Sequence, residues 1–386
     1  MTVFRLRLAM TSSKIASPSA DRNDSFATIS MTILFAGGGT LGPVTPLLAA
    51  AEAWRRMDPD VSFVWVGTSD GPERALIEEA GIRFFSLPTA RFARYPSKEW
   101  IVLPQQIVRA FFGAWKILKE AKPDLVASAG GYTAVPVAWA ARARRIPVWI
   151  HQQDVLPLLS NRLTAWCATI ITTAWKRSTH DFSKQKTVWV GNPVRGILRE
   201  GKKEEAVRAF SLDPSFPTVL VIGGGTGSAW INAQMAEIGR HLASRANIIH
   251  LTGLGKSLPA LEAIRGRYHV VEFLTREIQN ALACADAVVS RAGMGAMTEL
   301  ASARKPSILI PLPYSPQEAN AQMAKDADAA IVLSQPLTTS EDLGRAIIAL
   351  LDDKKKQRLF SERIGALLPT DISDALVERV RARCFG

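Results

Sequence analysis

Two stretches far apart in the chain share one unusual form, and they constrain the fold more than any other feature. Residues 32–42 read TILFAGGGTLG, and residues 218–228 read TVLVIGGGTGS. Each has an apolar run typical of a buried strand, then three glycines, and then the start of a helix-like stretch. A strand, a tight glycine turn and a helix form the opening unit of a parallel sheet that helices cover on both faces. The repetition therefore predicts two domains of like topology.

The remainder of the chain alternates short apolar runs with amphipathic segments, which is the pattern of the α/β class. In the first half, strands are expected at 32–37, 61–67, 83–87, 124–130, 147–151 and 168–173, and helices at 46–57 and 105–121. After the run that begins at residue 218, strands are expected at 247–253, 268–273, 286–293 and 306–313. Both domains are thus predicted to be Rossmann-like and doubly wound.

The domain boundaries follow from interruptions in this pattern. We expect the first domain to span residues 31–190 and the second to span 206–365. The linker between them, 191–205, reads GNPVRGILREGKKEE, in which proline and glycine break the pattern before a charged run. Residues 366–386 are expected to form a C-terminal helix that packs back on the first domain.

The first thirty residues differ from the rest of the chain. Residues 1–30 lack the uninterrupted apolar core of a secretory signal, and they become polar before the first strand. We expect them to be a disordered extension. Met31 stands directly before that strand and is an alternative start.

The charge of the chain favours an anionic partner for the first domain. The formal net charge is +12, and residues 31–195 hold 20 Lys and Arg against 12 acids, whereas residues 196–386 hold 23 against 21. Cys167, Cys284 and Cys384 lack the spacing of metal ligands, the five histidines are scattered, and no D-x-D element ends a strand. The sequence therefore predicts no metal site, and the sparse cysteines predict a reducing compartment.

The glycine loops by themselves leave several ligands open. A helix N-terminus behind a glycine turn suits an anion, although glycines there also serve only to turn the chain. Gly37, Gly39 and Gly42 spell G-x-G-x-x-G, but a dinucleotide also needs an acid at the end of the second strand, where Gly67 and Thr68 stand. Neither loop has the G-K-[ST] ending of an ATP or GTP P-loop. Two loops at equivalent places nevertheless favour a phosphate-bearing ligand.

Eight motifs occur in order between residues 31 and 365. They are GGGTLGPVTPLLAAAE (37–52), KPDLVASAGGYTAVPVAWAARARRIPVWIHQQD (122–154), NRL (161–163), GNPVR (191–195), GGGTGSAWIN (223–232), EFL (272–274), SRAGMGAMTELA (290–301) and PQEANA (316–321). This ordered set resembles the MurG family of peptidoglycan glycosyltransferases, which move N-acetylglucosamine from UDP onto lipid I.

The resemblance implies a GT-B architecture in which the first domain binds the acceptor and the second binds UDP-N-acetylglucosamine. It also implies an inverting transfer, without a metal or other cofactor, to undecaprenyl-diphospho-N-acetylmuramoyl-pentapeptide (lipid I), which gives lipid II. The donor contacts that it implies are Thr40, Leu41, Gly42, Arg195, Gly225, Thr226, Gly227, Leu274, Met294, Gly295, Ala296, Met297, Thr298, Glu299, Gln317 and Asn320.

Several of these donor residues have a particular role in the family and an ordinary structural alternative. Glu299 is expected to accept the ribose hydroxyls, or else it only complements a helix dipole. Arg195 is expected to bind the diphosphate in a two-pronged way, or else it forms a surface salt bridge. Gln317 is expected at the donor sugar hydroxyls, although it and Asn320 could instead cap a helix. Leu274 matches the position whose backbone contacts uracil.

The acceptor side departs from the family pattern. The residues that the resemblance places there are Tyr132, Gln152, Asp154 and Asn161. HQQD (151–154) stands where the family has H-E-Q-N or H-E-S-D, so a glutamate is lost and Asp154 remains. The family's opening loop usually ends in a histidine, but here the residue is Pro43, which has no proton to give or take. Asp154 is therefore the candidate base, and its structural alternative is to hold the loop against Asn161 or Arg162.

Residues 89–122 interleave basic and apolar side chains. The basic residues are Arg91, Arg94, Lys98, Arg109 and Lys116, and the apolar ones are Trp100, Ile101, Val102, Leu103, Phe111, Phe112 and Trp115. Such a segment is typical of a protein that lies on an anionic membrane surface, here the cytoplasmic face, although the helical spacing of 105–121 assigns part of it to the core. No nucleic-acid partner is expected, because the aromatics form no known reading motif.

Three hypotheses follow. The first is the transfer to lipid I at the membrane, with cell-wall synthesis or division proteins as further partners. The second, prompted by Pro43 and Gln152, is a UDP-sugar transferase or epimerase of the same fold with another acceptor. The third is a non-catalytic scaffold that binds sugar nucleotides.

Overall fold

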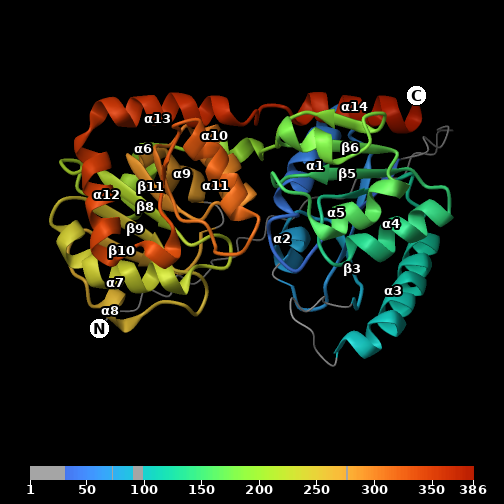
Figure 1. The fold of residues 1–386 in the computed structure, drawn as a ribbon, viewed down its shortest axis with the longest axis horizontal. Coiled ribbons are helices and arrows are strands. Elements are labelled where there is room, and N and C mark those ends of the chain that lie inside the picture. The colour runs from blue at the N-terminus through green and yellow to red at the C-terminus, as the bar shows by residue number, and fades with distance from the viewer. Residues whose placement is uncertain (1–30, 72, 90–98, 275–276) are drawn as a thin grey trace, which may run out of the picture. The chain divides into compact units, whose positions relative to one another are not determined.

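The computed structural model describes residues 31–71, 73–89, 99–274 and 277–386 (Figure 1). The expected extension at 1–30 and the basic residues Arg91, Arg94 and Lys98 lie outside the described residues. Within the described residues, two parallel sheets have helices on both faces. The predicted α/β class, with two Rossmann-like sheets, is confirmed.

The first sheet has seven strands in the order β3-β2-β1-β4-β5-β6-β7. The strands are β1 (Thr32–Ala36), β2 (Ser62–Gly67), β3 (Arg83–Ser86), β4 (Leu125–Ser128), β5 (Val148–Gln152), β6 (Ile170–Thr173) and β7 (Thr187–Trp189). The accompanying α-helices are α1 (Thr45–Met57), α2 (Glu73–Glu79), α3 (Glu99–Ala121), α4 (Ala134–Ala143) and α5 (Leu159–Thr164). All six predicted strands are present, and β7 is the additional one.

Alternate residues of β1 explain why the sheet is covered on both faces. Ile33 and Phe35 are buried in one cluster together with Trp54 of α1, whereas Leu34 and Ala36 are buried in another with residues of α3 and α4. Successive side chains of a strand point to opposite faces, so a strand with both faces buried is a continuous apolar run. Each such fully buried large side chain stabilises the fold by about 1.5–3 kcal/mol.

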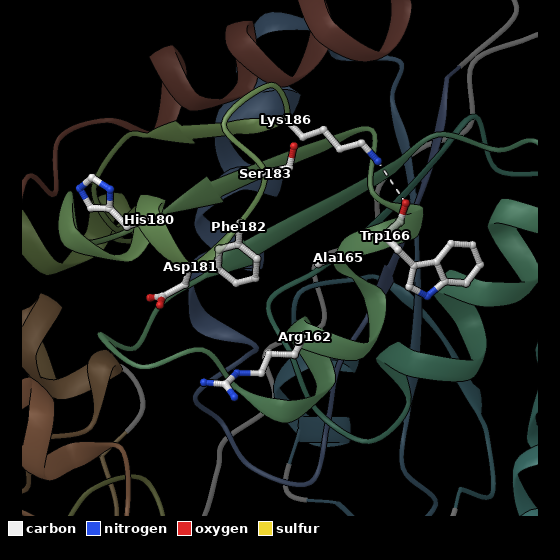
Figure 2. A pocket seen from close by; sticks show the side chains of 8 residues that line it. All are labelled: Arg162, Ala165, Trp166, His180, Asp181, Phe182, Ser183 and Lys186. Carbon is white, nitrogen blue, oxygen red and sulfur yellow. Dashed lines mark hydrogen bonds between the residues drawn. The ribbon is translucent and has the colours of Figure 1, made fainter.

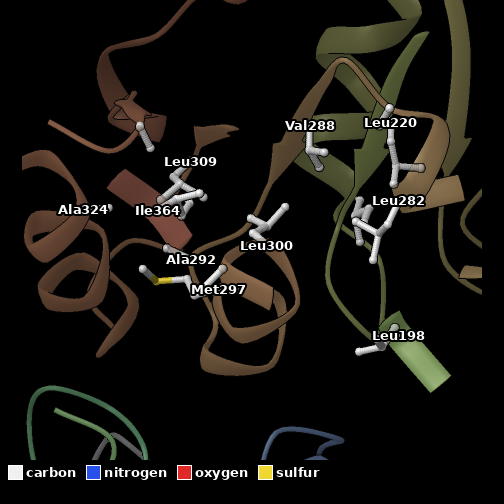
Figure 3. Packing of buried hydrophobic residues seen from close by; sticks show 14 of the residues in the cluster. Leu198, Leu220, Leu282, Val288, Ala292, Met297, Leu300, Leu309, Ala324 and Ile364 are labelled. Atoms are coloured by element: carbon white, nitrogen blue, oxygen red, sulfur yellow. The ribbon is translucent and has the colours of Figure 1, made fainter. Parts of the chain in front are cut away.

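The second sheet has six strands in the order β10-β9-β8-β11-β12-β13. The strands are β8 (Thr218–Ile222), β9 (Asn247–Leu251), β10 (Tyr268–Val271), β11 (Ala287–Ser290), β12 (Ser307–Leu309) and β13 (Ile331–Val332). Its helices are α6 (Lys203–Ala209), α7 (Ala229–Ala243), α8 (Pro259–Glu262), α9 (Ile278–Cys284), α10 (Met294–Ala303), α11 (Gln317–Asp326), α12 (Ser340–Asp352) and α13 (Lys354–Leu367). Figure 3 shows part of one core cluster, in which the strands contribute Leu220, Val288 and Leu309 and the helices contribute Leu282, Leu300 and Ile364.

The last helix, α14 (Ser373–Phe385), lies beside α1 of the first domain (Figure 1). Leu376, Val377 and Val380 are fully buried in the cluster that contains Ile33 and Phe35 of β1. The C-terminal helix therefore completes one face of the first sheet.

No helix in the described part of the chain is both long enough and apolar enough to cross a bilayer.

Candidate nucleotide-sugar site

Each sheet has a point at which the strand order reverses, and ligands of doubly wound sheets bind at that point, beyond the carboxyl ends of the strands. In the first sheet the reversal lies between β1 and β4, and in the second between β8 and β11. The glycine loop at 37–43, called here the first loop, follows β1. The loop at 223–228, called here the second loop, follows β8. The repeated sequence motif thus lies at both reversal points.

The first loop already contains an anion of the protein itself. Glu73, at the start of α2, is fully buried, and both of its carboxylate oxygens lie 3.2 Å from the Gly39 backbone nitrogen. One oxygen also accepts hydrogen bonds from the Thr68 backbone N–H at 2.9 Å and from the Thr68 hydroxyl at 2.6 Å. A Cβ atom on Gly38 would lie 2.2 Å from this carboxylate, so glycine is required there. The Gly39 amide, which a phosphate would otherwise use, is therefore occupied.

The rest of the first loop is packed against its neighbours. A Cβ atom on Gly131 would lie 2.8 Å from the backbone of Gly38, so the loop that follows β4 supports the first loop closely. Pro43, which replaces the expected histidine, is buried. Tyr132 is 41% exposed and stands beside Gly39.

The second loop is built differently. Gly227 has φ +74°, and a Cβ atom there would lie 2.1 Å from the carbonyl oxygen of Thr252, so only glycine is accommodated. Ser228 caps the N-terminus of α7 by accepting from the Ile231 N–H, and it also accepts from buried Arg291 at 2.7 Å. In the described part of the chain, no protein group accepts from the backbone N–H groups of Gly225 and Thr226. These free donors at a helix N-terminus form a site for an anion.

Two cations lie next to the second loop. The Lys256 ammonium donates to the Thr226 carbonyl oxygen at 2.7 Å, which holds the charge at the loop. Arg291 donates to the carbonyl oxygens of Ile310 and Pro311 as well as to Ser228, so it links the second loop to the segment that follows β12. The positive end of the α7 dipole adds to these charges.

Contacts between the two loops bring predicted donor residues together. A Cβ atom on Gly225 would lie 3.0 Å from the Cδ1 atom of Leu41, so these two residues touch. A Cβ atom on Gly295, at the start of α10, would lie 3.7 Å from the Thr45 hydroxyl. Leu41 of the first loop therefore faces the second loop.

Glu299 lies in α10, close to the start of that helix and to Arg195 of the interdomain segment. Burial raises the pKa of the Glu299 carboxyl to about 7, and the positive charge of Arg195 opposes this rise. The group therefore holds its proton to a higher pH than an ordinary glutamate does. Two neutral hydroxyl groups, such as those of a ribose, can donate hydrogen bonds to both oxygens of a carboxylate at this position without adding charge.

Several other predicted donor residues are already engaged within the protein. The Thr298 hydroxyl donates to the Met294 carbonyl oxygen, Met297 is buried in the core, and Leu274 packs against that core. The Gln317 side-chain oxygen accepts from the Leu312 N–H at 3.0 Å. The Nε2 atom of Gln317 remains directed toward Gly293, within 3.7 Å of where a Cβ atom would stand.

Asn320 links the two domains. Its Nδ2 atom donates to the Asp154 carboxylate at 2.7 Å and to the Ala292 carbonyl oxygen at 3.2 Å, and its Oδ1 atom accepts from the Val155 N–H at 2.9 Å. All its polar atoms are therefore used to hold the loop after β5 against the second domain. The structure places Asn320, rather than Asn161 or Arg162, as the partner of Asp154.

The loop after β5 is braced from within by two amides. Gln152, at the end of β5, is buried and donates to the carbonyl oxygens of Asp154 at 2.7 Å and Leu156 at 3.0 Å. Its own side-chain oxygen accepts from Asn161 at 2.7 Å. Burial raises the pKa of the Asp154 carboxyl, whereas the hydrogen bond from Asn320 works in the opposite direction. Asp154 is thus a fixed carboxylate of increased basicity.

A chain of hydrogen bonds, which the sequence did not predict, runs from β5 to α10. His151 contacts Thr172 at 2.9 Å and the Asn192 side-chain oxygen at 2.7 Å, and Asn192 donates to Thr298 at 2.6 Å. Burial lowers the pKa of His151 to about 4, so the ring is neutral, and both of its nitrogens are engaged. His151 therefore connects the domains and is not free to act as a base.

Two pockets lie outside the set of predicted donor residues. Figure 2 shows the first, of about 440 Å³, with Arg162, Trp166, His180 and Lys186 among its lining residues. The second, of about 380 Å³, lies between Leu156 and Leu159 of the first domain and Tyr314 and Glu318 of the second, and it also includes Arg162.

Two doubly wound domains, with a glycine loop before a helix in each, are the architecture of two-domain enzymes that use nucleotide sugars. Comparisons with known proteins give the family. Residues 33–173 match the glycosyltransferase family 28 N-terminal domain, and residues 218–366 match the glycosyltransferase family 28 C-terminal domain. The chain belongs to glycosyltransferase family 28.

Two relatives that match nearly the whole chain carry the same description. The UDP-N-acetylglucosamine–N-acetylmuramyl-(pentapeptide) pyrophosphoryl-undecaprenol N-acetylglucosamine transferase of Shouchella clausii is 36% identical over 90% of this chain and 98% of its own length. The protein of the same description from a Nocardioides species is 32% identical, over 91% of this chain and 97% of its own length.

Solved structures agree on the fold. The crystal structure of Acinetobacter baumannii MurG has a TM-score of 0.68 at 24% identity and covers 91% of this chain and 99% of its own. UDP-GlcNAc 2-epimerase from Neisseria meningitidis, bound to UDP-GlcNAc, has a TM-score of 0.65 at 14% identity and covers 91% and 100%.

Proposed function

We propose that this chain transfers N-acetylglucosamine from UDP-N-acetylglucosamine to lipid I, the lipid-linked diphospho-N-acetylmuramoyl peptide, and so forms lipid II. The descriptions of its relatives support this choice of donor and acceptor. The observation that carries it is the second loop, whose Gly225 and Thr226 amides have no acceptor among the residues that the structure describes and lie just before the N-terminus of α7.

The donor is held by charge and by hydrogen bonds from the protein alone. The amides of the second loop and the guanidinium of Arg195 bind the diphosphate, which stabilises the negative charge that develops on the leaving UDP. The Glu299 carboxylate accepts the two ribose hydroxyls, since a carboxylate offers two oxygens side by side. Gln317 is directed by its Nε2 atom toward the donor sugar.

The acceptor hydroxyl is activated by Asp154. An inverting displacement needs a base on the side opposite the leaving group, and Pro43 has no group that accepts a proton. Because burial raises the pKa of Asp154, its carboxylate takes a proton more readily than an ordinary aspartate. The hydrogen bond from Asn320 fixes the direction of this carboxylate.

The acceptor is reached at the membrane surface, where α3 is the contact. Within the described part of α3, the apolar side chains of Val108 and Phe112 are 53% and 63% exposed, and Arg109 and Lys116 are exposed near them. Aromatic and aliphatic groups insert among lipid headgroups, while the cations bind their phosphates. The protein is thus peripheral, on the cytoplasmic face of the membrane.

The test is turnover by the purified protein with lipid I and labelled UDP-N-acetylglucosamine. Formation of labelled lipid II is the expected result. Tight binding of UDP without any labelled lipid II would contradict the acceptor. Hydrolysis or epimerisation of the donor in the absence of lipid I would instead support the second candidate, which Pro43 and Gln152 favour.

A further inference from the structure

The pocket of about 380 Å³ lies directly beside the loop that carries Asp154. The first domain contributes Leu156, Leu159 and Arg162 to its lining, and the second contributes Tyr314, Pro316 and Glu318. None of these residues has been assigned a role in binding the donor, in the reaction, or at the membrane.

Tyr314 is the most unusual residue of this pocket. Its side chain is 91% exposed, and its backbone has φ +55°, a left-handed conformation that non-glycine residues rarely adopt. The turn is fixed because the Glu318 carboxylate accepts the Tyr314 N–H at 3.1 Å and the Ser315 hydroxyl donates to the Leu312 carbonyl oxygen at 2.6 Å. Strained positions that surrounding contacts hold in place are typical of ligand sites. The fold thus places an aromatic ring at the surface of the pocket and not in the core.

The chemistry of the pocket is that of a site for a short peptide. Leu156 and Leu159 are 45% and 57% exposed and offer apolar contact. Arg162 and Glu318 are exposed and bring opposite charges to the same pocket. A ligand with aliphatic side chains, a carboxylate and an ammonium group is complementary to this combination.

Both walls of the pocket are tied to Asp154. On one side, the Gln152 amide donates to the carbonyl oxygens of Asp154 and Leu156, so that Leu156 is held in place with Asp154. On the other side, Asn320 of α11 donates to the Asp154 carboxylate, and Pro316 and Glu318 belong to the start of the same helix. The pocket therefore has a fixed position relative to the candidate base.

We propose that this pocket binds the peptide of the acceptor, an inference that rests on the proposed function. The peptide of a muramyl acceptor is attached to the same sugar ring that carries the reacting hydroxyl. With that hydroxyl at Asp154, the peptide begins within the width of one sugar ring, at the entrance of the pocket. The Tyr314 ring packs on the peptide, Arg162 binds a carboxylate, and Glu318 binds the ammonium group of a diamino side chain.

The decisive variant is Tyr314→Gly, because glycine adopts the left-handed turn without strain while the ring is lost. With the peptide-bearing acceptor, we expect KM to rise about tenfold, the usual scale for loss of an aromatic contact in a ligand pocket. With a lipid-linked diphospho-muramoyl acceptor that lacks the peptide, KM is expected to stay the same in the variant and the wild type. The affinity for UDP is expected to be unchanged. The melting temperature is expected to be unchanged or slightly higher.

Two further variants test the charges and provide the control. Glu318→Gln keeps the acceptor for the Tyr314 N–H but removes the charge, so it is expected to abolish the preference for a free over an acetylated diamino side chain. Leu337→Ala removes an apolar side chain that is 83% exposed and lies outside this pocket, and it is expected to leave both KM values unchanged.

The outcomes separate this proposal from the proposed function. Absence of turnover by the wild-type protein with either acceptor contradicts the proposed function. The peptide site is overturned if the wild type turns over both acceptors and Tyr314→Gly either raises both KM values equally or raises neither. The proposed function is then unaffected.

Discussion

The two glycine loops begin from nearly the same sequence and differ in the charged groups that the protein places beside them. In the first loop, the Gly39 amide donates to the buried Glu73 carboxylate, and Pro43 contributes no N–H at all. In the second loop, the Gly225 and Thr226 amides have no acceptor among the described residues, and Lys256 lies beside them. The first loop therefore holds an anion of the protein itself at Gly39, and its Thr40, Leu41 and Gly42 amides have no acceptor among the described residues. In the described part of the chain, the second loop holds no such internal carboxylate at its open amides and has a cation beside them.

The difference teaches that a glycine turn before a helix does not by itself indicate a phosphate site. What decides is whether the protein supplies its own acceptor for the amides. Gly39 is partly buried and its N–H is paired with Glu73, whereas Gly225 and Thr226 are exposed, so their N–H groups are open to solvent or to a ligand. The first loop is still part of the site, because Leu41 contacts Gly225 across the two domains. We expect the affinity for the diphosphate to depend mainly on the second loop.

The largest effect is expected in the first domain, at Asp154, the proposed base. Asp154→Asn keeps an oxygen that accepts from Asn320 but removes the base, so kcat is expected to fall by about 100- to 10,000-fold. The affinity for UDP, measured by calorimetry, is expected to stay within twofold. Unchanged turnover would exclude Asp154 as the base. A loss of UDP affinity as large as the loss of kcat would mean that Asp154 and the UDP site are not independent.

A smaller but still large effect is expected from Gly227→Ala in the second loop. The new methyl group would lie 2.1 Å from the Thr252 carbonyl oxygen at a residue with φ +74°, so the loop has to move away from its anion-binding form. We expect the affinity for UDP to fall about 100-fold, equivalent to about 2.7 kcal/mol. Gly42→Ala in the first loop is the matched control, because its Cβ atom would have no neighbour closer than 3.6 Å. If both variants weakened UDP equally, the loops would not differ in function.

Glu73→Ala tests the internal anion of the first loop. It leaves the buried Thr68 N–H and the partly buried Gly39 N–H without their carboxylate acceptor, and we expect the free energy of unfolding to fall by about 2 kcal/mol. Chemical denaturation measures this change, and Glu73→Gln, which keeps one acceptor oxygen, is expected to lose less. UDP affinity of the folded protein should remain near the wild-type value. If both variants had the same free energy of unfolding as the wild type, and neither bound phosphate more tightly, Glu73 would not hold the loop.

The smallest effect is a pH dependence at Glu299, whose pKa burial raises to about 7. Only the carboxylate accepts both ribose hydroxyls, so the affinity for UDP-N-acetylglucosamine is expected to rise about tenfold between pH 6 and pH 8. The same raised pKa means that stability falls as pH increases from about 4.5, the value of a free glutamate, to about 7. Glu299→Gln is expected to remove both dependences. A flat affinity profile in the wild type would contradict the ribose role.

Much of the fold was predictable because it depends on local patterns. The central strands, such as β1 and β8, are buried on both faces and therefore appear in the sequence as apolar runs. β7 and β13 were missed because they are short edge strands whose side chains are only partly buried. Helix α3 starts at Glu99, before the predicted residue 105, and includes Pro104.

The site was less predictable because its partners are distant in sequence. Glu73 was missed, since nothing near it indicates that its carboxylate bonds to an amide 34 residues earlier. Asn320 was predicted at the donor, yet its amide bonds to Asp154, which is 166 residues away. Its role toward the donor stays a prediction, as do the roles of Arg195 and Glu299.

The most direct test of the account is the crystal structure of the protein with UDP-N-acetylglucosamine bound. We predict the diphosphate at the amides of Gly225 and Thr226, the ribose hydroxyls at the Glu299 carboxylate, and the Glu73 carboxylate still bonded to Gly39. A diphosphate bound at Gly39–Gly42, with Glu73 displaced from the first loop, would contradict it.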